Sequence, residues 1–200
     1  MATRHSSATS AIWGPDADPD TTRKPLPVRA GLAAFALLAA LATCAPPHGD
    51  APREGNALTG GMSGLPSSEH AKVGQSWWFG LGTLRNRWDS PVELTDVRVL
   101  DLPEGLAVGR YAAFDSKETG GLLLVYQDGD PAFPTSTYKD HAKQPVELPP
   151  GEDSSLFYAV KTTVTGPLSG ESSRCRYTYT QGSETFTQDL PCRFTLSLEK

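Results

Sequence analysis

Two runs of residues on either side of Gly182-Ser183 constrain the fold more than any other feature of this sequence. Both runs alternate between apolar and polar side chains, as strands do when one face is buried and the other meets solvent. We predict a β-hairpin over 174–198 in which Cys175 lies opposite Cys192. Its apolar face would carry Cys175, Tyr177, Tyr179, Phe186, Leu190, Cys192, Phe194, Leu196 and Leu198, with Tyr177 opposite Leu190 and Tyr179 opposite Gln188.

Five further segments have the composition and spacing of strands, and they cover residues 76–86, 92–102, 106–114, 120–127 and 154–164. The continuous apolar run in 120–127 predicts a central strand, and a break in the alternation near Thr95-Asp96 predicts a bulge. The prolines of 128–145 predict a long loop. About seven or eight strands separated by turn signals indicate an all-β fold, an antiparallel sandwich or barrel.

The amino-terminal part of the chain has the pattern of a targeting segment. Residues 31–43 are small or apolar, and Arg23, Lys24 and Arg29 precede them. A basic segment followed by about 7–15 apolar residues is typical of a secretory signal peptide, whereas a helix that spans a bilayer needs about 20. We predict a signal peptide over 1–43, with a long polar amino-terminal region.

Leu41-Ala42-Thr43-Cys44 resembles the bacterial lipobox, in which Leu, a small residue and Gly, Ala or Ser precede a cysteine. Thr43 departs from that pattern. The resemblance implies that the chain is cut before Cys44 and that this cysteine carries lipid, such as palmitate. Two alternatives stay open: cleavage after Ala42 with plain secretion, and an uncleaved membrane anchor.

The cysteine count agrees with lipidation. The chain has three cysteines, and an odd number in a secreted protein needs an explanation. If Cys44 carries lipid, Cys175 and Cys192 remain as a pair that can form a disulfide in an oxidising compartment. The alternative is two free thiols in the core. Pro191 cannot donate a hydrogen bond to a neighbouring strand, so we expect an edge position or a bulge beside Cys192.

Residues 44–71 predict a flexible tether that starts at the lipidated cysteine. They are rich in Pro, Gly, Ser and Ala and have few large apolar side chains, so they cannot bury enough surface to fold alone. The folded domain would then cover residues 72–200. Removing 1–43, with four basic and three acidic side chains, leaves 14 basic and 20 acidic ones, a net charge of −6. Without a basic cluster, nucleic acid is an improbable partner.

Two short motifs are similar to steps of bacterial immunoglobulin-like domains. They are GTLRN (82–86) followed by DSPVEL (89–94), and LPPGE (148–152) before a strand. Together with the leader, the chain resembles actinobacterial immunoglobulin-like surface lipoproteins. This resemblance implies an immunoglobulin-like β-sandwich over about residues 76–198. The chain lacks the tryptophan-to-disulfide signature of antibody domains, because its cysteine pair lies within one hairpin.

Three tryptophans and two arginines form a candidate ligand platform: Trp77, Trp78, Trp88, Arg85 and Arg87. Trp77 and Trp78 point to opposite faces of their strand, so one of them could be exposed to bind sugar rings or a protein. The arginines could frame an anionic ligand. The alternative is that the tryptophans pack in the core and the arginines are surface charges.

Catalytic motifs are weak. Ser136 and Lys139 match S-x-x-K, in which a lysine activates a serine, but the partner motifs S-D-N and K-T-G do not occur. Asp128-Gly129-Asp130 lacks the spacing of a calcium loop. We therefore expect no cofactor, no metal and no enzymatic activity. The alternative is a secreted, hydrolase-like enzyme with a site around Ser136, Lys139, Asp140 and His141.

The sequence thus predicts a non-catalytic, lipid-anchored domain on the outer face of the cell membrane. Its partners would be the membrane, through the lipid, and a cell-envelope protein or polysaccharide. A structural module without a specific ligand is a further alternative.

Overall fold

The computed structural model describes residues 51–200, and residues 1–50, which include the predicted signal peptide and Cys44, lie outside it. The described chain is nearly all strand and turn. The strands are β1 (Arg53–Glu54), β2 (Leu58–Gly60), β3 (Ser67–Ala71), β4 (Ser76–Asn86), β5 (Val92–Val99), β6 (Glu104–Asp115), β7 (Val125–Gln127), β8 (Val146–Leu148), β9 (Asp153–Ser169), β10 (Ser172–Gln181) and β11 (Glu184–Leu198); the helices are α1 (Ser116–Thr119) and the 3₁₀ helix η1 (His141–Lys143).

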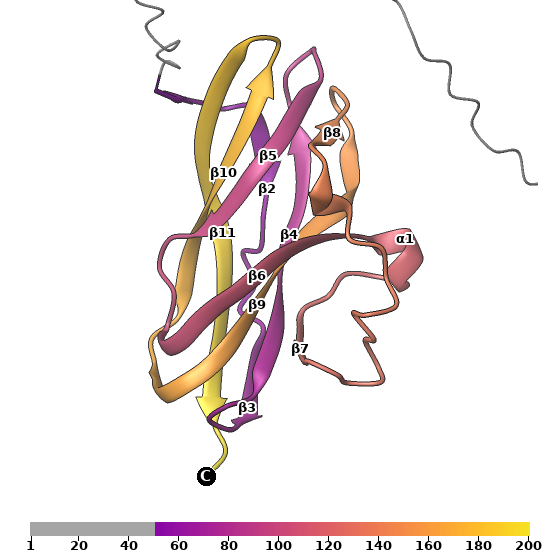
Figure 1. Cartoon of the computed structure of the whole chain (residues 1–200). Coiled ribbons are helices and arrows are strands. Elements are labelled where there is room, and N and C mark those ends of the chain that lie inside the picture. Colours follow the sequence, from indigo (N-terminus) through magenta and orange to yellow (C-terminus); the bar gives the residue numbers. More distant parts are fainter. Residues whose placement is uncertain (1–50) are drawn as a thin grey trace, which may run out of the picture. The chain divides into compact units, whose positions relative to one another are not determined.

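These strands form two sheets that pack face to face (Figure 1). The first sheet has the order β1-β11-β10-β5-β8, and β3 also pairs with β11. The second sheet has the order β2-β4-β9-β6, and β7 also pairs with β4. The domain is therefore an all-β sandwich, as predicted. Most neighbouring strands are antiparallel, but β1 and β3 run parallel to β11, which the sequence did not indicate.

The main core lies between the two sheets. Phe79 of β4 stacks on Phe194 of β11 with ring centroids 4.3 Å apart. The Tyr177 hydroxyl of β10 donates a hydrogen bond to the Leu81 carbonyl of β4 at 3.3 Å. Burial raises the pKa of Tyr177, so its hydroxyl keeps the proton that this hydrogen bond needs. The predicted apolar face of the hairpin is thus the face that meets the second sheet.

The β10–β11 hairpin has a tighter turn than predicted. Gln181 pairs with Glu184, so the loop consists of Gly182 and Ser183 alone. Gly182 has φ 57°, the left-handed conformation that such two-residue turns require. Tyr177 consequently lies opposite Gln188 and not Leu190. The shift changes the pairing by two residues, and because strand side chains alternate with a period of two, the buried face is unchanged.

Cys175 and Cys192 form a disulfide with an S–S distance of 2.10 Å and Cα atoms 5.6 Å apart. Both residues are fully buried. The two cysteines are not directly opposite, because Cys175 pairs with Leu190 and Pro191 pairs with Arg174. The register shifts between Ser172 and Arg174, so the bulge expected beside Cys192 is present.

The other strand predictions are confirmed in part. Residues 76–86 form β4, and β6 and β9 contain the segments 106–114 and 154–164. Asp96 pairs with Thr178 and Leu94 with Tyr179, which places the predicted bulge of β5 at Thr95. Strand β8 was not foreseen.

The prediction of a central strand over 120–127 is wrong. Only Val125–Gln127 form a strand, β7, which pairs with β4 alone over three residues. Leu122 and Leu124 are 42% and 48% exposed, whereas Leu123 between them is buried. Of its three leucines the apolar run therefore buries only Leu123, and Val125 is partly buried at the edge of the sheet.

The prediction of a flexible tether is wrong for residues 51–71. They form β1, β2 and β3, which lie along β11 and β4. Ala57, Leu58 and Ala71 are buried. This segment is held mainly by backbone hydrogen bonds to strands that would otherwise be edges, as between the Gly55 nitrogen and the Thr187 carbonyl at 2.7 Å. Such pairing needs few large side chains, so composition alone did not reveal it.

We predict that the disulfide contributes about 3 kcal/mol to the free energy of unfolding, because it closes a loop with a sequence separation of 17. The double variant Cys175→Ala/Cys192→Ala should lose this amount in urea unfolding monitored by tryptophan fluorescence. Cys44→Ala serves as the control and should unfold like the wild type. Equal stability of the double variant and the wild type would contradict the prediction.

Candidate functional site

The outer face of the second sheet is covered by residues 116–145, which we call the cover segment. It contains α1, β7 and η1, and Figure 1 shows it as a long excursion of the chain between β6 and β9. Its Leu123 and Phe133 are buried with Trp78, Phe114 and Phe157 of the sheet, in a second hydrophobic cluster. The part of the second sheet that lies under the cover segment is therefore buried on both faces.

Small residues on the sheet allow the cover segment to approach closely. Gly80, Ala159 and Ala112 pair with one another across β4, β9 and β6. The Gly80 nitrogen donates a hydrogen bond to the Leu124 carbonyl at 3.0 Å. A β-carbon at Gly80 would lie 1.9 Å from the Leu123 carbonyl oxygen. A glycine is thus required here for space, because any side chain would push the cover segment away.

Asp128 ties the cover segment to Trp78. Its carboxylate accepts hydrogen bonds from the Trp78 indole nitrogen at 2.8 Å and from the Lys161 ammonium at 2.6 Å. Partial burial by itself would raise the pKa of Asp128, but the hydrogen bonds from Lys161 and Trp78 outweigh it and the pKa lies below its ordinary value. Asp128 therefore stays ionised and acts as an anchor for the cover segment.

Asp140 makes a second link, to the edge of β6. Its Oδ1 accepts hydrogen bonds from the backbone nitrogens of Ala113 at 3.1 Å and Ala142 at 3.0 Å. Its Oδ2 lies 3.3 Å from the Arg110 guanidinium. Arg110 in turn lies over the Trp78 ring, 4.9 Å from its centroid, in cation–π geometry. These contacts fix Arg110 at the rim of the cover segment.

A hollow of about 440 Å³ opens between Arg110 and the cover segment. Its lining combines three basic side chains, one acidic side chain, two aromatic rings and two hydroxyls: Arg110, Lys139, Lys143, Asp140, Phe114, Tyr138, Thr135 and Ser136. We call it the cationic hollow. Charged side chains, hydroxyl groups and aromatic carbon therefore meet in one hollow. The sequence offered only the S-x-x-K motif as a signal for this place.

The residues of the predicted enzyme alternative are only partly brought together. Ser136, Lys139 and Asp140 line the cationic hollow, whereas His141 lines a neighbouring one, with its Nε2 3.5 Å from Glu118. Among the hydrogen bonds within residues 51–200, none joins Ser136 to Lys139 or His141. In the described conformation Ser136 therefore has no hydrogen bond to either of these bases.

The tryptophans of the predicted platform do not form an exposed surface, because Trp77 and Trp78 are buried and Trp88 is half-buried. Trp77 lies in the core between the sheets and is 6% exposed, and Trp78, under the cover segment, is 1% exposed. Trp88 packs edge-on against Phe186, with ring centroids 5.3 Å apart, and its indole nitrogen donates to Asn56. Both faces of β4 are buried, which is why neither neighbouring tryptophan reaches solvent.

Arg85 and Arg87 are exposed but do not frame a shared site. Arg85 lies 3.6 Å from the Asp153 carboxylate, and the Arg87 Nε donates to the Asn56 carbonyl at 2.5 Å. Each therefore has a partner within the domain. Cys44 lies outside the described residues, so the structure does not test its lipidation.

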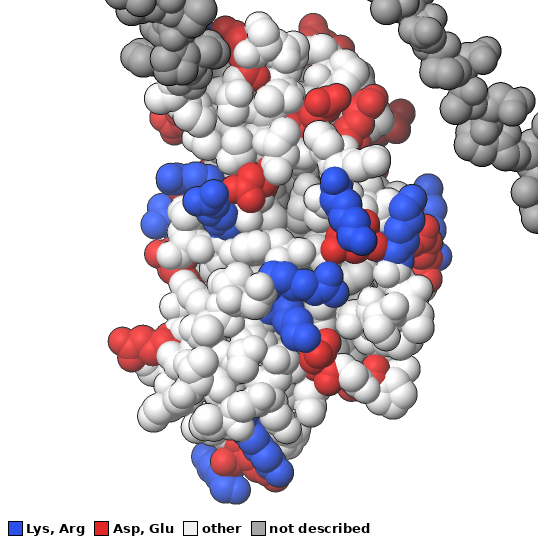
Figure 2. All heavy atoms as spheres, in the orientation of Figure 1, with Lys and Arg blue, Asp and Glu red and all other residues white. Residues whose placement is uncertain are grey.

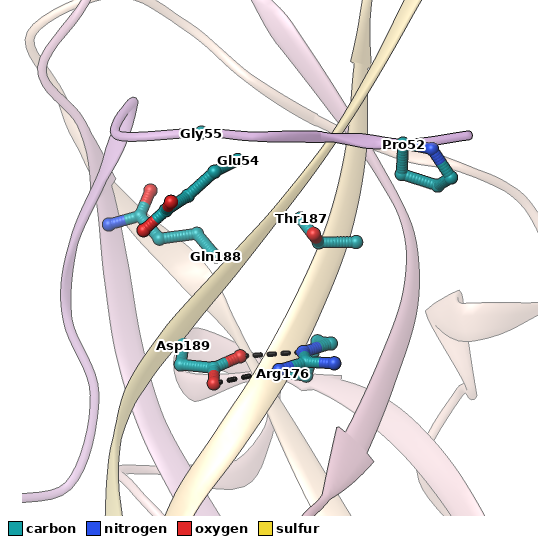
Figure 3. Close-up of a pocket in the computed structure, with 7 residues that line it drawn as sticks. All are labelled: Pro52, Glu54, Gly55, Arg176, Thr187, Gln188 and Asp189. Atoms are coloured by element: carbon teal, nitrogen blue, oxygen red, sulfur yellow. Dashed lines mark hydrogen bonds and ion pairs between the residues drawn. The ribbon is translucent and has the colours of Figure 1, made fainter. Parts of the chain in front are cut away.

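A second hollow, of about 540 Å³, lies between β1 and the outer face of the β10–β11 hairpin (Figure 3). Its central charges neutralise each other, because Arg176 makes two hydrogen bonds to Asp189, at 2.7 and 2.9 Å. The Arg176 guanidinium holds the pKa of Asp189 below its ordinary value. Glu54, Thr187 and Gln188 complete most of the lining. Because Arg176 and Asp189 are paired, this second hollow has fewer unpaired charged side chains for a ligand than the cationic hollow has.

No family model, curated protein or solved structure matches this chain. Among the described residues, no three His, Cys, Asp or Glu side chains are grouped so that they could hold a metal ion. Asp128 and Asp130, which the sequence marked as a weak cation motif, instead bond to Lys161 and to the Ala132 nitrogen. No helix within residues 51–200 has the length and hydropathy to cross a membrane.

We predict that Gly80→Ala loosens the cover segment. The added methyl group collides with the Leu123 carbonyl, and overpacking of this kind costs about 1–3 kcal/mol. Urea unfolding should show the loss, and limited proteolysis should cut within 116–145 faster than in the wild type. Gly166→Ala is the matched control, because nothing lies within 4 Å of its β-carbon position. Equal proteolysis of the two variants would contradict the prediction.

We predict that Asp128 contributes to stability only above acidic pH. Its pKa in the folded chain lies below the ordinary value of 3.8, so its contribution is complete above that value and is lost as the pH falls through the folded pKa. Asp128→Asn should cost about 1–2 kcal/mol at pH 7, and this difference from the wild type should shrink below pH 3.8. Urea titrations between neutral and acidic pH measure it. Asp89→Asn, at an exposed turn, is the control.

Proposed function

We propose that this chain is a lipid-anchored extracytoplasmic domain that works by binding and not by catalysis. On this proposal residues 1–43 are a signal peptide, Cys44 carries the lipid, and the sandwich lies at the outer face of the cell membrane. Its partner is a cell-envelope protein or polysaccharide.

The disulfide between Cys175 and Cys192 is the observation that carries the proposal. Disulfides form and persist in oxidising compartments and are rare in the cytosol. This bond uses two of the three cysteines of the chain and leaves Cys44 over. A single leftover cysteine directly after an apolar segment with basic residues before it fits a lipid-modified residue better than a core residue.

The strand order supports the immunoglobulin-like type. The second sheet has the order β2-β4-β9-β6, and the first contains β5-β10-β11. Taken in chain order, these strands correspond to the A-B-E-D and C-F-G sheets of constant-type immunoglobulin domains. Many cell-surface domains share this architecture. Because a fold does not by itself fix a function, the ligand has to be argued from the surface.

The geometry around Ser136 also favours binding. The carboxylate oxygens of Asp140 accept hydrogen bonds from two backbone nitrogens and from Arg110. Asp140 therefore holds the cover segment in place. Lys139 and Ser136 are both exposed on the wall of the hollow. Such side chains can contact a ligand non-covalently. Catalysis of acyl transfer, in contrast, needs a serine within hydrogen-bond distance of its base.

The proposal predicts a defined mature amino terminus. Wild type and Cys44→Ala are expressed in a bacterial host, membranes are separated from medium, and the amino-terminal peptide and the free thiols are measured by mass spectrometry. The wild type should be in the membrane fraction, start at Cys44 with added acyl mass, and have no free thiol. Cys44→Ala should lose the acyl mass and the membrane association that depends on it.

Thr43→Ala provides a matched control, because it gives the chain the residue that the lipobox pattern prefers and should be processed at least as completely as the wild type. A wild-type protein that starts at Thr43 and is free in the medium would overturn the lipid anchor.

A further inference from the structure

The cationic hollow has a local charge opposite to that of the domain around it. Residues 51–200 contain 14 basic and 19 acidic side chains, yet Arg110, Lys139 and Lys143 line the hollow with one carboxylate, Asp140. On the face shown in Figure 2, basic side chains gather in the middle and acidic ones dominate the upper end. The hollow therefore attracts anions although the whole domain repels them.

The two lysines of the hollow have no acidic partner within the domain. Lys72 and Lys161 each lie within 2.8 Å of a carboxylate. No ion pair among residues 51–200 involves Lys139 or Lys143, and both side chains are exposed. The one carboxylate that lines the hollow, Asp140, is already bonded to Arg110 and to the backbone. The ammonium groups are thus available to an external anion.

The walls beside these charges suit a sugar ring. Tyr138 is half-buried, and its ring is held against Phe133 and Phe114, with centroid distances of 5.1 and 6.4 Å. Ser136 and Thr135 add hydroxyl groups that can donate and accept hydrogen bonds. An aromatic surface next to hydroxyls and ammonium groups matches a ligand with apolar ring faces, hydroxyls and an acidic substituent.

The hollow is also held in shape before any ligand arrives. The chain around it is fixed by the Asp140 bonds to Ala113 and Ala142 and by the burial of Phe133. A site whose backbone is already fixed loses less entropy when it binds than one whose loop must first become ordered. A volume of about 440 Å³ lies in the range of small-ligand pockets.

We propose that the cationic hollow binds an acidic carbohydrate, through a carboxylate or phosphate group held by Lys139, Lys143 and Arg110 and a sugar ring placed against Tyr138. This inference rests on the proposed function in one respect, because it names an envelope polysaccharide as the partner of a binding domain.

The test uses the full chain with Cys44→Ala and the disulfide intact, so that binding is measured without any lipid. Calorimetric titrations with trigalacturonate and with glucose 6-phosphate present the two kinds of acidic group. Maltotriose supplies the neutral sugar, and inorganic phosphate supplies the anion without a sugar. We expect binding of one or both acidic sugars, weaker binding of inorganic phosphate, and none of maltotriose. The acidic sugar that binds more tightly shows whether the site prefers a carboxylate or a phosphate group. Raised salt should weaken binding, because exposed charges are screened.

The double variant Lys139→Gln/Lys143→Gln should bind the preferred acidic sugar at least about fivefold more weakly. Lys72→Gln/Lys200→Gln is the matched control: it removes the same number of charges away from the hollow and should bind like the parent. Backbone NMR shifts of the parent on titration should concentrate in residues 135–143. Equal weakening in both double variants, equal binding of inorganic phosphate, or shifts elsewhere in the domain would overturn the inference.

The two proposals fail separately. A chain that binds trigalacturonate but starts at Thr43 in the medium keeps the carbohydrate site and loses the anchor. A chain that starts at an acylated Cys44 but binds no acidic sugar keeps the anchor and loses the site.

Discussion

The domain depends on burying one face of the β10–β11 hairpin against the second sheet. The stack of Phe79 on Phe194 and the hydrogen bond from Tyr177 to Leu81 join strands that are far apart in sequence. A buried aromatic side chain contributes about 1.5–3 kcal/mol, which is comparable to the contribution expected from the disulfide. The disulfide links two strands that supply eight of the 25 buried residues of the main core.

The strands that a sequence can reveal are those whose side chains alternate or form an apolar run between turn signals. The hairpin and β5 alternate with a period of two, whereas β4, β6 and β9 contain short apolar runs rich in aromatic or β-branched residues, so these segments were recognised. The hairpin register was missed by two residues, because alternation defines a face but not a pairing. Strands β1, β2 and β3 were missed because they are held mainly through their backbone. Their sequence looks like that of a linker, and only the neighbouring strand edges make them strands.

The candidate site was harder to predict than the fold, for a related reason. Whether Trp78 is exposed depends on residues 116–145, which are 38 to 67 positions away along the chain and have no regular period. The sequence placed Ser136, Lys139 and Asp140 near one another because they are close along the chain. It could not show that Arg110, from β6, would join them, because that depends on how the cover segment lies on the sheet.

The cover segment has a consequence for how this chain folds. It is inserted between β6 and β9, which are paired neighbours in the second sheet, so its aromatic residues can dock only after those distant strands have met. Between the pairing of β6 with β9 and the docking of the cover segment, Trp78, Phe114 and Phe157 face water on the assembled sheet. Partly folded chains with such a surface are prone to aggregate. Docking of the cover segment, and not formation of the sandwich, would then be the step at which newly made molecules are most prone to aggregate.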